Sequence, residues 1–227
     1  MIIETDNTVF GCGADAMVNT VNCVGFMGKG LALEFALRYP NLEKAYIQDC
    51  KENKVHTGKV NVYRLDDVTI INFPTKFHFK YFSKMEWVEQ GLEDFLRIYK
   101  NLGIQSVAFP LLGASNGGLD PNDVLALMKE RLAKADITVY ICHSKNPDEL
   151  ERKMIDRFNS ASIDSVATAV RLTSAQKESL LAAKGHIAHF YEIREYPKIG
   201  DATYRALFAF FKEDYSGLSE MVQMRLF

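Results

Sequence analysis

The chain has 227 residues, of which 48% are hydrophobic and 25% are charged, and its formal net charge at pH 7 is −2. This composition is typical of a folded globular protein and excludes a disordered or fibrous chain. The charge argues against a protein that wraps nucleic acid over its whole surface, but it is compatible with a local basic patch. No run approaches the roughly 18 apolar residues that span a bilayer, and no basic segment leads into an apolar signal core, so we expect a cytoplasmic protein without a membrane partner.

Strands and helices are predicted to alternate from the N-terminus to about residue 145. Four continuous apolar runs and one alternating run predict strands at 16–20, 59–65, 68–73, 106–112 and 137–142. Amphipathic stretches with stop and cap signals predict helices at 31–39, 85–99, 121–135 and 149–158. This alternation favours an α/β fold in which helices cover both faces of a largely parallel or mixed sheet.

The last third of the chain has a different character. The polar residues 159–162 are typical of a junction, so we divide the chain into a domain at 1–160 and a small, mainly helical region at 161–227. Within this region Thr173 is expected to cap one helix and Asp201 another. Because a segment of this size seldom forms a stable core alone, we expect it to pack on the first domain or on a partner.

The first predicted strand leads into a glycine-rich loop, Gly25-Phe26-Met27-Gly28-Lys29-Gly30. Its glycines let the backbone approach a ligand closely, and the following helix turns its unpaired N–H groups and positive dipole end toward the loop. A diphosphate fits this arrangement; the alternative is a tight connection that only needs positive φ angles. Asn19 and Asn22, at the end of the strand, could bind ribose hydroxyls or could shape the turn.

A second glycine-rich loop, Gly113-Ala114-Ser115-Asn116-Gly117-Gly118-Leu119, follows the predicted strand 106–112 and precedes a helix. We expect it to enclose the opposite side of the same diphosphate, so that the two loops form a cleft. Asp120 comes next and is followed by Pro121, which suits the first helical position. This pattern predicts that Asp120 is the N-cap of that helix.

Lys76 lies just beyond the predicted strand 68–73, after Pro74 and Thr75, so its amine is expected at the mouth of the cleft. A partly desolvated lysine there has a lowered pKa and can attack an electrophilic sugar carbon, whereas an ordinary surface lysine serves only solubility. The run that follows interleaves lysines with aromatic residues. Such a mixture is typical of single-stranded nucleic acid binding, here through Phe77, His78, Phe79 and Lys80, or of a loop anchored on the core.

Other familiar chemistries lack support. The segment 28–30 has neither the spacing of a P-loop nor the serine or threonine that follows its lysine. The glycines of 11–16 match the dinucleotide-binding pattern, but they precede a predicted strand, whereas that pattern requires a helix. The four cysteines have no metal or disulfide spacing, and we expect them to be reduced. His186, His189 and Glu192 recur at helical spacing without further ligands, so neither a metal nor a cofactor is expected.

Taken together, the motifs resemble the macrodomain family, which binds ADP-ribose, and most closely the DarG-type antitoxin macrodomains of DarT/DarG modules. The resemblance covers roughly residues 1–145. Its strongest parts are Asn19-Thr20-Val21-Asn22, Gly25 with 27–30, Asn72-Phe73-Pro74-Thr75-Lys76, and Asn116-Gly117-Gly118-Leu119-Asp120. It implies a three-layer α/β/α sandwich with a mixed central sheet.

The resemblance also implies a function, which is the removal of ADP-ribose from thymine bases in single-stranded DNA as the antitoxin to a DarT-like toxin. Lys76 is then the nucleophile at the anomeric carbon of the distal ribose, and Asp120 assists hydrolysis of the intermediate. Asn22 orients that ribose. The residues implied to bind ADP-ribose are Asn19, Asn22, Gly25, Met27, Gly28, Lys29, Gly30, Thr75, Gly113, Ala114, Ser115, Asn116, Gly117, Gly118 and Leu119.

Two alternatives remain open from the sequence. The Gly-Asp pair by which many macrodomains recognise adenine is replaced by Asn7-Thr8, and residues 161–227 match no element of the family. These departures leave room for a non-catalytic ADP-ribose-binding or toxin-sequestering module. A glycohydrolase acting on ADP-ribosylated protein carboxylates is the second alternative, because the motifs do not distinguish the leaving group.

Overall fold

The computed structural model describes residues 1–65 and 68–213. The chain forms two compact units, Met1–Asn146 and Pro147–Phe227. The first contains the sheet and the glycine-rich loops, and the second is helical. The helix at 149–160 belongs to the second unit, so the division lies earlier in the chain than the boundary expected at residue 160.

The first unit is built on one six-stranded sheet in the order β1-β6-β5-β2-β4-β3. Its strands are β1 (Ile2–Asn7), β2 (Ala16–Asn22), β3 (Asn61–Arg64), β4 (Thr69–Lys76), β5 (Ser106–Pro110) and β6 (Thr138–Asn146). β3 pairs antiparallel with β4, and all other pairs are parallel, so the sheet is mixed as expected. Only β1 was not anticipated.

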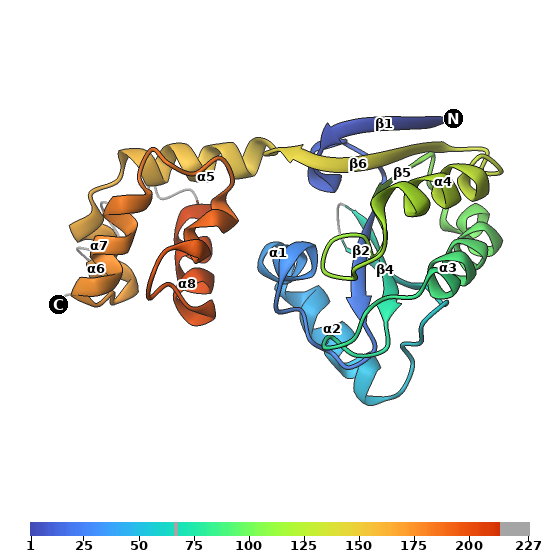
Figure 1. Cartoon of the computed structure of the whole chain (residues 1–227), viewed down its shortest axis with the longest axis horizontal. Helices are drawn as coiled ribbons and strands as arrows, with labels where there is room; N and C mark the ends of the chain where they lie inside the picture. The colour runs from blue at the N-terminus through green and yellow to red at the C-terminus, as the bar shows by residue number, and fades with distance from the viewer. Residues whose placement is uncertain (66–67, 214–227) are drawn as a thin grey trace. The chain divides into compact units, whose positions relative to one another are not determined.

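Helices cover both faces of this sheet. In Figure 1, α1 (Gly30–Arg38) and α2 (Pro40–Lys51) lie on one side of β2 and β4, and α3 (Met85–Ile98) and α4 (Pro121–Leu132) lie on the other. Successive strand residues face opposite sides of a sheet. Ala16 and Val18 therefore pack with the α3 and α4 side, whereas Met17 packs with Phe35 of α1. The expected three-layer sandwich is confirmed.

Pro40 does not end the helical region, as the sequence suggested, but begins a second helix. It occupies the first position of α2, where the missing N–H of proline has no intrahelical partner to lose. This helix matters for the site because Tyr46, one of its residues, is completely buried against the first glycine-rich loop.

The second unit consists of α5 (Glu149–Ser160), α6 (Ile163–Val170), α7 (Ser174–Ala183), η3 (Phe190–Glu195) and α8 (Asp201–Lys212). Its core is aromatic: Phe158 of α5 contacts Phe190 and Phe211 edge to face. These contacts explain why α5 belongs here. Thr173 caps α7 through a capping box with Gln176, as expected from the sequence.

The expected cap of α8 was wrong. Gly200 occupies the N-cap position, and Asp201 is the first residue of the helix. From there the Asp201 carboxylate accepts a hydrogen bond from Arg194. Among the described residues, no helix has the length and apolarity that a membrane span requires.

Candidate active site

Three loops meet at the carboxyl edge of the central strands. β2 lies between β4 and β5 and runs parallel to both, so the loops that follow these three strands leave the sheet on the same side. The register places Asn22 beside Lys76. Beyond this pair, the Cys23 N–H donates to the Phe77 carbonyl at 3.1 Å and ties the first loop to the segment after β4.

Asn22 organises the first glycine-rich loop. Its Oδ1 accepts hydrogen bonds from the Val24 N–H at 2.9 Å, the Phe26 N–H at 3.4 Å and the Tyr46 hydroxyl at 3.2 Å. Its Nδ2 donates to the Phe26 carbonyl at 2.7 Å. The turn-shaping role is therefore realised, and within 1–65 and 68–213 the second N–H of this amide has no acceptor.

The loop ends at the N-terminus of α1, which has no side-chain cap. Lys29 occupies the N-cap position and makes no capping hydrogen bond. In the described part of the chain, the first turn of α1 therefore has no side-chain cap, and the helix dipole and the exposed lysine favour an anion at the same place. The rest of the loop is tightly packed, and Met27 is buried beneath it. A Cβ at Gly28 would contact Phe26, and a Cβ at Gly25 would contact Ile47.

Asn19 differs from the other residues predicted to bind ligand. It is completely buried within the sheet, and its Nδ2 donates to Oδ1 of Asn72 on the neighbouring strand at 2.9 Å. Its side chain joins β2 to β4 inside the fold. Thr75, in β4, is also buried, at 4% exposure, and it supports the end of the strand that carries Lys76.

The second glycine-rich loop approaches the first directly. Gly30 has φ +54°, and a Cβ at this position would lie 2.7 Å from Nδ2 of Asn116. Glycine adopts this left-handed conformation without strain and leaves room for the Asn116 side chain. The loop is closed internally by a hydrogen bond from the Leu119 N–H to the Gly113 carbonyl at 3.1 Å, with Ala114, Ser115, Gly117 and Gly118 between them. The two glycine-rich loops thus lie together, as expected.

Lys76 is half-buried between these loops. Its Nζ donates a hydrogen bond to the backbone carbonyl of Asn116 on the second loop. Burial lowers the pKa of the Lys76 amine below that of an ordinary lysine, because a desolvated ammonium is less stable. Among the described residues it forms no ion pair with a carboxylate, which would have the opposite effect.

Asp120 follows the second loop and caps α4. Its Oδ1 accepts hydrogen bonds from the N–H of Asn122 at 2.8 Å and of Asp123 at 3.2 Å. Pro121 occupies the first helical position, so the capping prediction is confirmed. Both bonds use the same carboxylate oxygen, and Oδ2 has no hydrogen-bond partner in the described part of the chain. The cap therefore does not exclude a chemical role for this side chain.

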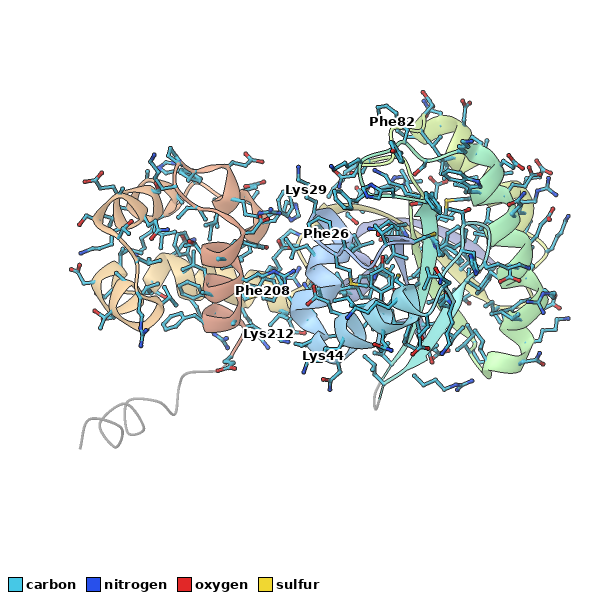
Figure 2. All side chains as sticks on the ribbon, turned by 90° about the horizontal axis from the view of Figure 1, so that it is seen from below. Phe26, Lys29, Lys44, Phe82, Phe208 and Lys212 are labelled. Atoms are coloured by element: carbon cyan, nitrogen blue, oxygen red, sulfur yellow. The ribbon has the colours of Figure 1, made fainter. Side chains whose placement is uncertain are left out.

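An aromatic and basic segment at 77–84 follows Lys76. The ring of Phe79 packs on Phe26 of the first glycine-rich loop, with 4.7 Å between centroids, and stacks on His78 at 4.3 Å. His78 Nδ1 accepts the Lys80 N–H at 3.2 Å and so shapes the turn. Figure 2 labels Phe26 and Lys29 of the first glycine-rich loop and Phe82 of this segment.

A groove with a volume of about 540 Å³ lies along this segment. It is lined by residues of 77–84 and by Trp87 of α3, and we call it the aromatic groove. Of the nine large hydrophobic side chains that are exposed in the described residues, six belong to 24–26 and 77–82: Val24, Phe26, Phe77, Phe79, Tyr81 and Phe82. Exposed apolar side chains gathered in this way typically mark a binding surface.

Other chemical groups in the chain have structural roles. Burial raises the pKa of the Cys23 thiol to about 11, which disfavours the reactive thiolate. His189 is buried and paired with Glu151, with 3.2 Å between Nδ1 and Oε2. Within 1–65 and 68–213, no group of three or more His, Cys, Asp or Glu residues could hold a metal ion.

Sequence reasoning missed two contributors to the site. Tyr46 orders Asn22 from a helix that was not expected, and its hydroxyl donates to the Asn22 carbonyl at 2.7 Å. Ser83 is buried, and its N–H donates to the Gly117 carbonyl at 2.9 Å, which joins the second glycine-rich loop to the aromatic groove. Neither residue carries a local motif, so only the tertiary contacts identify them.

Comparison with known proteins identifies the family of the first unit. The profile of the family described as Macro domain matches residues 18–128. A DNA ADP-ribosyl glycohydrolase of Mycobacterium tuberculosis is 44% identical over 147 residues, which are 62% of this chain and 42% of that protein. A DNA ADP-ribosyl transferase-DNA ADP-ribosyl glycohydrolase fusion protein of Thermosipho africanus is 34% identical over 159 residues, covering 62% of this chain and 40% of the fusion protein. The chain thus covers about two fifths of the length of each relative.

Two solved structures are similar. The macrodomain of Mycobacterium tuberculosis DarG superposes with a TM-score of 0.60 and 42% identity, covering 63% of this chain and 97% of that one. Thermosipho africanus DarTG in complex with ADP-ribose superposes with the same TM-score and 30% identity, covering 64% of this chain and 42% of that one. Since the chain covers nearly the whole DarG macrodomain at this identity, it belongs to the macrodomain family.

Proposed function

We propose that this chain is a glycohydrolase that removes ADP-ribose from thymine bases in single-stranded DNA. The observation that carries the proposal is the position of Lys76 between two glycine-rich loops. This lysine is half-buried, its pKa is lowered, and it has no carboxylate partner among the residues that the structure describes. The similarity to proteins named DNA ADP-ribosyl glycohydrolase supports DNA as the substrate.

The first step of this function is the binding of ADP-ribose. The open N–H groups of α1, its dipole and Lys29 favour the diphosphate at the first glycine-rich loop. The second loop, which lies against Gly30 through Asn116, covers the same group from the other side. The distal ribose then extends toward Lys76 and Asn22, and the free amide N–H of Asn22 can donate to one of its hydroxyls.

The chemical step follows from the state of Lys76. The neutral amine attacks the anomeric carbon of the distal ribose, the bond from that carbon to the thymine nitrogen breaks, and its electron pair leaves with the base, which takes up a proton. A water molecule then displaces the lysine. Asp120 accepts a proton from this water through Oδ2, while Oδ1 continues to cap α4.

We further propose a DarT-like toxin as the partner of this chain. One relative is a fusion of a transferase with a glycohydrolase, so the two activities occur together in at least one protein. Co-expression with a DarT-like transferase tests this proposal. The wild-type chain should restore growth, and Lys76→Ala should not; restoration by both would indicate sequestration of the toxin without hydrolysis.

The hydrolysis itself is tested with a single-stranded oligonucleotide that carries one ADP-ribosylated thymine. Wild-type protein should release ADP-ribose and Lys76→Ala should not, whereas Lys100→Ala, which removes a lysine paired with Asp136 on the surface, should behave as wild type. Calorimetry with free ADP-ribose shows whether the Lys76→Ala site is still formed. Equal release by wild type and Lys76→Ala refutes the lysine mechanism, and release only from ester-linked protein substrate refutes DNA as the substrate.

A further inference from the structure

Four lysines, Lys29, Lys76, Lys80 and Lys84, lie around the two glycine-rich loops and the aromatic groove. None of them forms an ion pair with a carboxylate among the described residues. This side of the first unit therefore gathers cationic side chains without salt-bridge partners, in a chain whose net charge is −2. Its electrostatic complement is a polyanion.

The lysines of the groove lie beside aromatic rings. Lys84 Nζ is 5.0 Å from the centre of the Trp87 ring, and Lys80 Nζ is 5.9 Å from that of Phe79. Phe82 and Tyr81 are 78% and 63% exposed and make little contribution to the core. Flat apolar surfaces that alternate with cations are suited to a chain of alternating bases and phosphates, because bases stack on aromatic rings and phosphates pair with lysine.

The groove borders the site of the proposed reaction, because Phe77, which follows Lys76, is one of its lining residues. The segment that lines it begins at the residue after Lys76, and Ser83 joins it to the second glycine-rich loop. Phe82 contacts that loop closely, since a Cβ at Gly118 would lie 2.6 Å from its ring. The Ser83 side chain is buried against the same loop, since a Cβ at Gly117 would clash with its Oγ, and this packing fixes the groove segment to the loop.

We propose that the aromatic groove binds a nucleobase next to the modified thymine in single-stranded DNA, with Phe82 and Trp87 as stacking surfaces and Lys84 on the adjacent phosphate. This inference rests on the proposed function for the identity of the modified base. The groove volume lies within the roughly 300–1,000 Å³ of small-ligand sites, which is enough for one base with its sugar. The protein thereby recognises the strand as well as the ADP-ribose group.

Trp87 provides a direct measurement, because it is the only tryptophan of the chain. Titration with an unmodified oligothymidylate should quench its fluorescence, and thymidine monophosphate at the same concentration should quench it much less. Phe82→Ala should raise the Kd of the oligonucleotide about 5- to 100-fold, as expected for one lost stacking contact. Lys84→Ala should reduce the salt dependence of log Kd by roughly one phosphate contact.

Two variants serve as matched controls. Tyr191→Ala removes an aromatic side chain that is 51% exposed in the second unit, and Lys100→Ala removes a lysine that lies over the Tyr99 ring at 5.9 Å. Both should bind the oligonucleotide as wild type does. Since Phe82 is so exposed, its replacement should leave the melting temperature unchanged, and this measurement excludes misfolding as the cause of a loss.

Hydrolysis distinguishes this proposal from the proposed function. Phe82→Ala should lower the ratio of kcat/KM for an ADP-ribosylated oligonucleotide to kcat/KM for ADP-ribosyl-thymidine. If neither the wild type nor Phe82→Ala hydrolyses either substrate but Phe82→Ala still weakens oligonucleotide binding, the proposed hydrolase function is refuted and the proposed nucleobase site in the groove is supported. Unchanged oligonucleotide affinity in Phe82→Ala overturns the groove, as does a loss confined to association with a protein partner or with a second copy of the chain.

Discussion

Asp120 allows the capping and chemical roles of one carboxylate to be separated. Replacement by alanine removes both hydrogen bonds to the first turn of α4, and loss of an N-cap costs about 1 kcal/mol, in a range of roughly 0.5–2 kcal/mol. For a chain of this size that corresponds to a melting temperature lower by about 2–4 °C. Asparagine caps helices as well as aspartate does, so Asp120→Asn should melt as wild type.

The activities of the two variants should nevertheless be similar. Neither asparagine nor alanine can accept a proton from water, so the turnover of ADP-ribosylated oligonucleotide should fall about 10²- to 10⁴-fold in both. Differential scanning calorimetry and a product-release assay on the same preparations provide the two measurements. A wild-type rate in Asp120→Asn would reduce Asp120 to a cap alone.

Asp148 offers a matched control for this comparison. It caps α5 with nearly the same geometry, since its Oδ1 accepts from the N–H of Leu150 at 2.9 Å and of Glu151 at 3.2 Å. Asp148→Ala should destabilise the protein at least as much as Asp120→Ala and leave the rate unchanged at temperatures where it is folded. If Asp148→Ala lowers the rate equally, the loss in Asp120→Ala reflects stability and not chemistry.

Three further predictions concern individual side chains. Because only the neutral amine of Lys76 is nucleophilic and burial lowers its pKa, the single-turnover rate should rise with pH and level off below the pKa of an ordinary lysine; a rate independent of pH would contradict the mechanism. Cys23, with a pKa of about 11, should react with iodoacetamide at pH 8 roughly a hundredfold more slowly than free cysteine. Mass spectrometry can follow this labelling, and rapid labelling would show that the thiol is not buried. Asn19→Ala leaves its partner Asn72 unpaired inside the sheet and should lower the free energy of unfolding by about 1–3 kcal/mol, as measured by chemical denaturation. The calorimetric Kd of ADP-ribose should stay unchanged. A weaker affinity for ADP-ribose would show that Asn19 contributes to ligand binding.

Five of the six strands of the first unit and the two glycine-rich loops could be predicted from the sequence alone, whereas β1 and α2 could not. Apolar runs such as 68–73 and 106–112 have the period and length of buried strands, and the glycines at 25–30 and 113–118 mark the turns after them. These signals are local, so they can be read without the partner strands. The capping of α4 by Asp120 is local in the same way, because the acceptor and both donors lie within four residues.

The roles of several site residues follow from contacts between distant parts of the chain. Asn19 and Asn22 are three residues apart in one strand, yet the first faces Asn72 inside the sheet and the second meets the loop and Tyr46. Their roles depend on neighbours far along the chain, which composition and spacing do not encode. The same is true of the aromatic groove, whose Ser83 is joined to Gly117, 34 positions further along the chain. The boundary before α5 also depends on distant residues, since the aromatic rings that hold this helix lie up to 53 positions further along, at Phe211.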